Sequence, residues 1–292
     1  MFSISVFSQS GLNSFLKPSD SLNISKRNGV IIAQSTLMGG TLLALSEAWY
    51  KDHKKSDFHL YNDNIEWLQM DKAGHAFSAY QLSRASSELL QWSGVTKKQS
   101  VLYGSASAIA FLSFVEVLDG FSSEWGFSYG DMIANFSGSI FYATQEFLWD
   151  EQRIFIKYSF RTTPYASRRP NVLGNTLQEQ ILKDYNGQTY WLSFNIHSFF
   201  KESKIPKWVN IALGYGAEGM ITGQEELVNM IFLPEKERYR QYYISLDIDL
   251  TKIKTQSHFL STLFSVINTI KIPAPTFEFT SNGKSKFHLI YF

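Results

Sequence analysis

Cysteine is absent from the 292 residues of the sequence. This absence excludes disulfides, thiolate chemistry and a lipidated N-terminal cysteine within these residues. The sequence also has almost no net charge, because 27 Lys and Arg residues stand against 26 Asp and Glu residues. A chain without a field of one sign does not attract nucleic acid over long range, so we expect no nucleic-acid partner.

Aromatic residues are abundant, with 24 Phe and 15 Tyr in a total aromatic share of 16%. This excess is typical of proteins with aromatic belts at a membrane boundary. The first nine residues, MFSISVFSQ, resemble the end of an apolar export signal but include no basic n-region. We interpret residues 1–27 as an N-terminal segment, either a clipped export signal or an ordinary disordered terminus.

Three apolar stretches and one amphipathic stretch predict helices within residues 28–150. The apolar stretches are residues 29–50, 101–118 and 132–149, and the amphipathic one is residues 65–92. The first approaches the roughly 20 residues that a helix needs to cross a bilayer. Small residues in the three apolar stretches permit close packing between helices. We therefore expect an antiparallel helical bundle.

A two-residue alternation replaces the helical period in the strand-rich residues 151–292. Apolar residues at the even positions of 242–250 alternate with mostly polar residues, which predicts a strand with two unlike faces. Similar patterns predict strands at residues 154–160, 190–196, 208–215, 276–280 and 286–292.

The fold class is therefore α+β, in which an N-terminal helical bundle packs with a C-terminal antiparallel sheet or partial β-barrel of outer-membrane type. A soluble antiparallel sheet with its apolar face on the helices is the alternative, since the same alternation serves both. Short helices predicted at residues 224–232 and 259–270 interrupt the strands and argue against a pure barrel.

Titratable residues gather in the helical part at spacings that place them on common helix faces. Asp71 and His75 lie four residues apart, so the carboxylate can orient or charge-stabilise the imidazole. Lys72 is adjacent to this pair. Glu116 and Asp119 lie three residues apart at the end of an apolar stretch.

A second polar group follows the turn after these residues. Glu124 lies in the turn, and Ser128 is predicted to cap the next helix with Asp131 at its third position. Asn135 lies four residues beyond Asp131. Asp131 and Asn135 therefore form a polar stripe on an otherwise apolar helix.

These residues resemble the patterns of two related families, the YfiM-like family and the VanZ-like membrane family. The matching residues are Asp71, Lys72, His75, Leu82, Glu116, Ser128, Asp131, Asn135 and Gly138. Asp119-Gly120 and residues 125–131 also resemble the YfiM-like family, whereas VanZ-like proteins often carry Gln and Arg where this chain has Asp119 and Trp125. The YfiM-like resemblance covers residues 65–146 and implies a predicted periplasmic lipoprotein without an agreed activity, although the lipoprotein label conflicts with the absence of cysteine.

Three interpretations of the polar residues stay open. As catalytic residues, Asp71, His75, Glu116 and Asp131 would serve lipid or ester hydrolysis with His75 as general base. As a metal site, the same four residues and Asp119 offer His and carboxylate ligands. Their spacing matches no compact ligand motif, so we predict no cofactor and keep a metal ion as an open alternative. As a polar core, they fix the register of the helices. The polar-core or binding residues are Lys72, Asp119, Glu124, Ser128 and Asn135.

Polar residues of the strand-rich part are interpreted as structural. The pattern predicts a solvated loop rather than a phosphate clamp at Arg161, Arg168 and Arg169. The alternating strands contain His197 and His288, which we interpret as structural residues.

The sequence as a whole predicts a cell-envelope protein at the outer membrane of a Gram-negative bacterium, or at the periplasmic face of that membrane. The predicted partners are membrane lipid and other outer-membrane proteins. The leading function is a structural or assembly component, and the alternative is a lipid- or cell-wall-modifying hydrolase.

Overall fold

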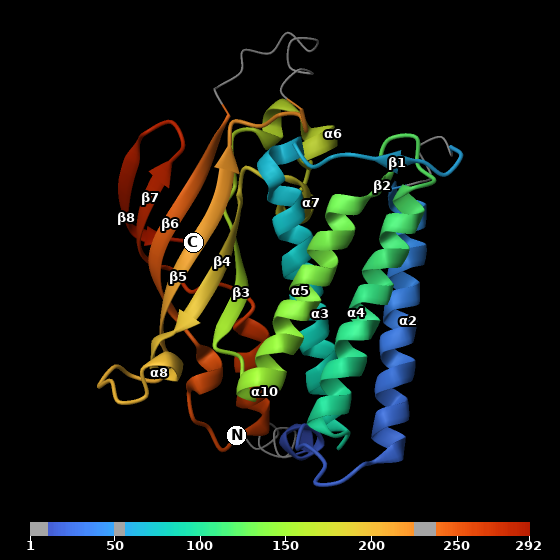
Figure 1. The fold of residues 1–292 in the computed structure, drawn as a ribbon, viewed down its shortest axis with the longest axis vertical. Helices are drawn as coiled ribbons and strands as arrows, with labels where there is room; N and C mark the ends of the chain where they lie inside the picture. Colours follow the sequence, from blue (N-terminus) through green and yellow to red (C-terminus); the bar gives the residue numbers. More distant parts are fainter. Residues whose placement is uncertain (1–10, 50–55, 225–237) are drawn as a thin grey trace, which may run out of the picture. The chain divides into compact units, whose positions relative to one another are not determined.

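The computed structural model describes residues 11–49, 56–224 and 238–292, and the chain divides into two compact units. The first unit consists of Met1–Asp63, Ser78–Gln152 and Thr255–Thr262. The second consists of Asn64–Phe77, Arg153–Lys254 and Leu263–Phe292. The helices and the antiparallel sheet confirm the α+β class (Figure 1). Residues 1–10 of the predicted N-terminal segment, which include the pattern of an export signal, lie outside the described residues.

The first unit is mainly helical, and its elements follow the predicted pattern. Its long helices are α2 (Ile24–Trp49), α3 (Met70–Trp92, from Ser78 onward), α4 (Lys97–Asp119) and α5 (Tyr129–Trp149). Helix α4 packs against both α5 and α2. Two short strands, β1 (Leu60–Tyr61) and β2 (Phe127–Ser128), pair in parallel.

Small polar residues join the helices of the first unit. Ser83 Oγ donates to Ser139 Oγ at 3.0 Å, which joins α3 to α5. Ser87 Oγ donates to the carbonyl of Ser100 at 3.0 Å, which joins α3 to α4. A side chain added at Gly104 of α4 would lie 2.8 Å from the backbone nitrogen of Ser87. Close packing through small residues, as predicted, therefore holds α3, α4 and α5 together.

Two helices of the described chain, α2 and α4, are long and apolar enough to cross a membrane. The qualifying spans are Ile24–Ser46 and Lys97–Asp119. Core helices of soluble proteins have the same length and composition, so these spans alone are weak evidence for membrane insertion.

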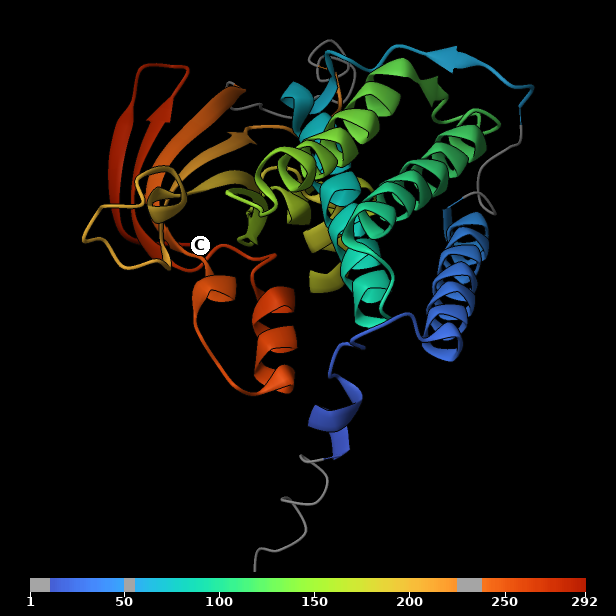
Figure 2. The same ribbon diagram turned by 60° about the horizontal axis from the view of Figure 1, so that its bottom comes forward.

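The second unit contains a six-stranded sheet in which every strand pairs antiparallel with the next (Figure 2). The strands are β3 (Ile154–Phe160), β4 (Gln188–Asn195), β5 (Val209–Glu218), β6 (Tyr239–Ile248), β7 (Ala274–Thr280) and β8 (Ser285–Tyr291). All six predicted strands are confirmed. The order β3-β4-β5-β6-β7-β8 leaves β3 and β8 at opposite edges, so the predicted outer-membrane barrel type is not confirmed.

Short helices lie between the longer elements. They are η1 (Glu66–Gln69), η2 (Ala166–Arg168), α6 (Pro170–Leu173), α7 (Leu177–Lys183), α8 (Ile196–Phe199), η3 (Leu250–Lys252) and α10 (His258–Ile267). Helix α10 confirms the helix predicted at residues 259–270, whereas the helix predicted at 224–232 lies almost entirely outside the described residues. The segment after α10 covers the edge of β3, because Lys271 N donates to the Tyr158 carbonyl at 2.9 Å.

The sheet has a polar inner face that is buried. The buried polar residues on this face are Lys157, Ser159, Thr189, Ser193, Asn195, Asn210, Gln241, Ser245, Asp247, Thr276 and Glu278. Three aromatic rings fill its middle, with centroid separations of 5.5 Å for Trp191 and Tyr243 and 4.7 Å for Tyr243 and Tyr291. Gly214 lies beneath Trp191, where a Cβ atom would come within 2.7 Å of the indole ring.

A fully buried ion pair joins the strands at one end of the inner face. Lys157 Nζ lies 2.8 Å from Asp247 Oδ2, and neither side chain is exposed. Lys157 also donates to Asn268 Oδ1 at 2.9 Å, and Ser193 Oγ donates to Asp247 Oδ2 at 2.7 Å. A buried pair of charges is tolerated when further hydrogen bonds satisfy both partners, as they do here.

Lys271 is a second buried cation in this region, and its titration predicts how stability depends on pH. Burial lowers the pKa of Lys271 from 10.5 to about 8, while Asp247 opposes the shift and Lys157 adds to it. Between about pH 8 and 10 the unfolded chain therefore holds more protons than the folded chain, so the free energy of unfolding rises with pH. We expect Lys271→Met to lose this rise in urea titrations. If the free energy of unfolding of the variant still rises as steeply over this pH range, another titrating group causes the rise.

Candidate functional site

Three of the sequence-predicted residues lie together in the second unit, at the start of α3. His75 Nε2 lies 3.7 Å from Asp71 Oδ1, and Lys72 Nζ lies 3.1 Å from Asp71 Oδ2. The Tyr185 hydroxyl donates to Asp71 Oδ1 at 2.7 Å. Burial disfavours the charged carboxylate, but His75, Lys72 and Tyr185 together outweigh burial and lower the pKa of Asp71. Asp71 is therefore an ionised carboxylate that several donors hold in place.

An unusual backbone precedes Asp71 and sets where α3 begins. Trp67, Leu68 and Gln69 have φ values of 47°, 50° and 63°, in the left-handed region that is costly for residues other than glycine. Tyr215 donates to the Leu68 carbonyl, and Arg240 donates to Gln69 Oε1 at 2.5 Å. Contacts from two strands of the sheet therefore hold this turn.

The other predicted residues lie in the first unit, where the predicted helix cap is confirmed. Asp131 N donates to Ser128 Oγ at 3.1 Å, and Ser128 Oγ donates to Asp63 Oδ1 at 2.6 Å. Ser128 N donates to Glu116 Oε2 at 3.4 Å. Glu116, Ser128 and Asp131 are buried. The cap therefore joins the end of α4 to the start of α5.

The remaining predicted residues of this unit differ in burial. Asn135 is fully buried, Asp119 is half-buried and Glu124 is exposed. Glu124 is therefore exposed rather than buried, and of the two roles predicted for it, polar core or binding, the binding role stays a prediction. Its place in a turn between α4 and β2 leaves it at the surface.

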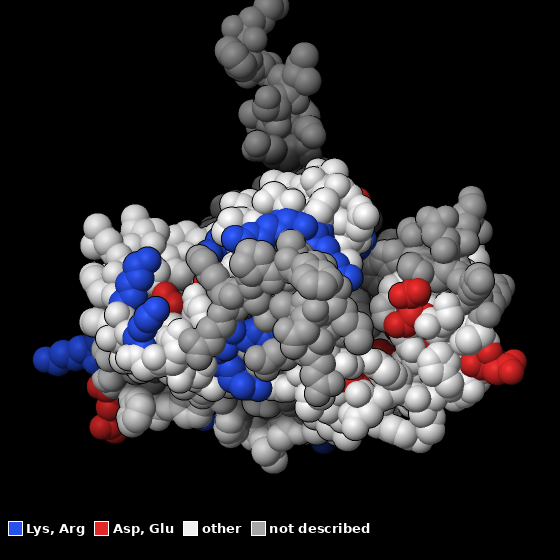
Figure 3. All heavy atoms as spheres, turned by 90° about the horizontal axis from the view of Figure 1, so that it is seen from above, with Lys and Arg blue, Asp and Glu red and all other residues white. Residues whose placement is uncertain are grey.

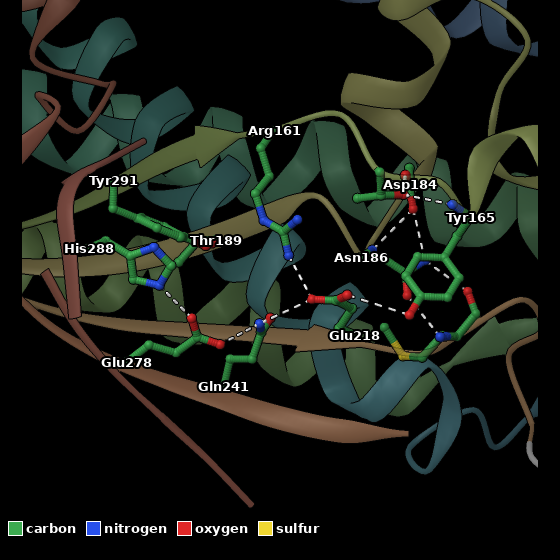
Figure 4. A network of polar contacts seen from close by, with 12 residues as sticks. Arg161, Tyr165, Asp184, Asn186, Thr189, Glu218, Gln241, Glu278, His288 and Tyr291 are labelled. Carbon is green, nitrogen blue, oxygen red and sulfur yellow. Dashed lines mark hydrogen bonds and ion pairs between the residues drawn. The ribbon is translucent and has the colours of Figure 1, made fainter. Parts of the chain in front are cut away.

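A polar pocket lies on the inner face of the sheet in the second unit and has a volume of about 790 Å³ (Figure 4). Its lining residues are Arg161, Glu218, Tyr239, Gln241, Glu278, Thr280, Asn282, Lys284, Ser285, Lys286, His288, Ile290, Tyr291 and Phe292. They come from β5 to β8 and from the residue after β3. The pocket therefore depends on the pairing of strands that are far apart in the sequence.

Two carboxylates, one beside an arginine and one beside a histidine, form the floor of the pocket. Arg161 Nη2 donates to Glu218 Oε2 at 2.7 Å, and His288 Nε2 lies 2.6 Å from Glu278 Oε2. Gln241 Nε2 donates to both carboxylates, at 3.3 Å to Glu218 and 2.8 Å to Glu278. The two pairs therefore form one continuous hydrogen-bonded network (Figure 4).

Tyrosine side chains border this network. Burial and the neighbouring Glu218 raise the pKa of Tyr165 to about 12, so its hydroxyl stays protonated at neutral pH and donates to Glu218 Oε1 at 3.4 Å. Tyr291 donates to the hydroxyl of Tyr243 at 2.8 Å. These contacts fix the side chains before any ligand is present.

The sequence interpretation missed this pocket. It described Arg161 as part of a solvated loop and His288 as structural, but Arg161 forms an ion pair with Glu218 and both residues line the pocket. The available signal was the run of polar residues at every second position of β4 to β8. The alternation alone did not indicate a pocket, because only the folded sheet shows that the polar face is the buried one.

Comparison with known proteins gave one match. Residues 57–145 match a family described as "Predicted periplasmic lipoprotein (DUF2279)". No curated protein and no solved structure matched the chain. The match supports a periplasmic lipoprotein family of unknown function and suggests an envelope protein, but it does not confirm the YfiM-like or VanZ-like name. All nine sequence-predicted site residues lie within the matched range, and the pocket residues lie outside it.

Proposed function

We propose that the chain is an envelope protein at the outer membrane, or at its periplasmic face, and contacts membrane lipid through the outer face of its sheet. The supporting observation is the inverted polarity of the sheet, which buries its polar face and exposes its apolar face. The outer face is defined by the exposed residues Leu192, Ile211, Leu213, Tyr242, Ile244, Leu246, Phe277, Phe279, Phe287 and Leu289.

The strand register makes the outer face continuous. Leu213 lies opposite Ile244, and Ile244 lies opposite Phe277 in the next strand. Phe277 in turn lies opposite Phe287, with ring centroids 4.8 Å apart. Side chains that are opposite in adjacent antiparallel strands lie on the same face. The exposed apolar residues therefore form one patch across β5 to β8 rather than isolated positions.

Lipid suits this patch better than water does. A contiguous apolar patch is unfavourable in water and marks a protein or membrane contact. Strands β5 and β6 each have 10 residues, and membrane strands have about 9–11 residues. Polar-inside, apolar-outside alternation is the pattern of sheets that face lipid. Because open strand edges do not tolerate hydrocarbon, we place the central strands β5 and β6, rather than the edge strand β8, against the acyl chains.

The absence of cysteine permits a direct test with single-cysteine variants. Leu213→Cys and Leu246→Cys, each labelled with bimane, place a fluorophore on the outer face. We expect lipids that carry a nitroxide on the acyl chain to quench both labels strongly when the full chain is reconstituted into vesicles of phosphatidylethanolamine and phosphatidylglycerol.

Leu182→Cys is the matched control, because Leu182 is an exposed leucine of the same unit that lies on α7 outside the sheet. Its label is expected to show little quenching by the same lipids. Equal quenching at all three positions, or no quenching at Leu213 and Leu246, contradicts lipid contact through the outer face. Quenching of the two sheet positions by added soluble protein instead would identify a protein partner.

Hydrolysis of a lipid or cell-wall ester is a second candidate, supported by the Asp71–His75 pair. An ionised Asp71 beside His75 is the arrangement that orients a general base. We expect the full chain to hydrolyse p-nitrophenyl butyrate and His75→Gln to lose at least 90% of that activity, by the usual size of general-base effects. His258→Gln, at the start of α10, is the control. No hydrolysis above buffer by the unmodified chain contradicts this function.

A further inference from the structure

The floor of the pocket on the inner face consists of two carboxylates that already have partners within the sheet. Glu218 pairs with Arg161, and Glu278 pairs with His288. The side chains of Glu218 and Glu278 are only 18% and 10% exposed, so the pairs are partly shielded from water. A carboxylate oxygen has two lone pairs and can accept more than one hydrogen bond. The floor therefore retains the capacity to accept further hydrogen bonds from a ligand.

The rim of the pocket has an excess of positive charge. Lys284 and Lys286 line it on either side of the start of β8, and both side chains are exposed. Neither ammonium has an ion-pair partner among the residues that the structure describes. Figure 3 views the molecule from above, and basic side chains (blue) lie on the left side of this view with a few acidic ones (red) beside them.

Hydroxyl and amide groups continue the rim. Thr280 and Asn282 line the pocket at the β7–β8 turn, and the Thr280 hydroxyl donates to Asn282 Oδ1 at 2.6 Å. Gly283, with φ of 81°, permits the tight turn that brings Lys284 back over the pocket. The turn therefore fixes the position of the basic rim relative to the floor.

We propose that this pocket binds an acidic sugar, with a phosphate or carboxylate at Lys284 and Lys286 and with hydroxyl groups directed at Glu218 and Glu278. The anion matches the unpaired rim lysines. Hydroxyl donors match a floor of carboxylate acceptors whose positions are fixed by Arg161, Gln241 and His288. A volume of about 790 Å³ accommodates a mono- or disaccharide. This inference concerns the inner face and does not rest on lipid contact by the outer face.

Calorimetric titration of the full chain tests this proposal with four probes. They are glucose 6-phosphate, glucuronic acid, glucose and inorganic phosphate. We expect at least one of the two acidic sugars to bind about tenfold more tightly than either glucose or inorganic phosphate. The comparison of the two acidic sugars shows whether the site prefers phosphate or carboxylate.

Two double variants distinguish binding at the rim of this pocket from binding at other basic surfaces of the protein. Lys284→Gln combined with Lys286→Gln is expected to weaken binding of the acidic sugar by about tenfold or more, because charge-assisted hydrogen bonds are lost. Lys201→Gln combined with Lys204→Gln removes two exposed lysines elsewhere in the same unit and leaves the affinity unchanged.

Four results overturn the proposal. They are no binding of either acidic sugar, equal affinity for glucose, equal affinity for inorganic phosphate, and equal weakening in both double variants. Because all four substituted lysines are exposed, the variants are expected to fold, and their thermal unfolding temperature checks this.

Discussion

Replacing Asp247 with alanine lowers the free energy of unfolding by about 3–5 kcal/mol, the cost of leaving one member of a buried ion pair without its partner. Lys157 and Asp247 are fully buried, 2.8 Å apart, on the inner face of the sheet. Ser193 and the backbone nitrogen of Ile272 also lose their acceptor, since both donate to the Asp247 carboxylate. Urea titration followed by tryptophan fluorescence measures the loss.

Two further variants isolate the role of the charge. Lys157→Met combined with Asp247→Leu removes both charges and is expected to recover most of the lost stability, since apolar residues of similar volume often replace a buried pair at little cost. Glu202→Ala removes an exposed carboxylate of the same unit and is expected to have no measurable effect. A double variant that is no more stable than Asp247→Ala contradicts the ion-pair explanation.

The second large effect is predicted at Gly104, where α4 approaches α3. A Cβ atom at Gly104 would lie 2.8 Å from Ser87 N and 2.9 Å from the Ser83 carbonyl, so backbone atoms would have to shift. Overpacking of this kind costs about 1–3 kcal/mol. We therefore expect Gly104→Ala to lower the free energy of unfolding by this amount, as measured by urea titration.

Gly39→Ala in α2 is the matched control for Gly104→Ala. No atom lies within 4 Å of a Cβ atom at Gly39, so the substitution meets no steric obstacle. Glycine in a helix interior costs roughly 0.5–1 kcal/mol relative to alanine, so Gly39→Ala is expected to raise stability slightly. Effects of the same sign at both glycines argue against close packing of α3 and α4 as the cause.

Local sequence patterns predicted most elements but not where α3 begins. The amphipathic pattern predicts a helix from residue 65, whereas α3 begins at Met70. Residues Trp67 to Gln69 adopt left-handed backbone angles, which no propensity of these residue types favours. Their conformation depends on Tyr215 and Arg240, which lie more than 140 residues away in the chain. Only the folded sheet supplies these contacts.

The candidate sites show the same division between local and distant determinants. The Ser128 cap was predictable because capping involves residues three positions apart. The Asp71–His75 pair was predictable because both residues lie on one helix face. The pocket was not predictable, since Arg161 and Glu218 come together only through the pairing of β3, β4 and β5. The sequence alternation predicted two unlike faces but did not indicate which one faces inward.

We propose that the apolar face of the sheet points outward to lipid while the polar face is buried. A cysteine scan along β6 tests this arrangement most directly. Each of residues 242–246 is replaced singly by cysteine, labelled with bimane and exposed to lipids that carry a nitroxide on the acyl chain. Outer-face positions such as Ile244 and Leu246 are expected to be quenched, and the buried inner-face positions Tyr243 and Ser245 are not. Quenching therefore alternates with a period of two residues. Uniform quenching, no quenching, or the opposite alternation would contradict the account.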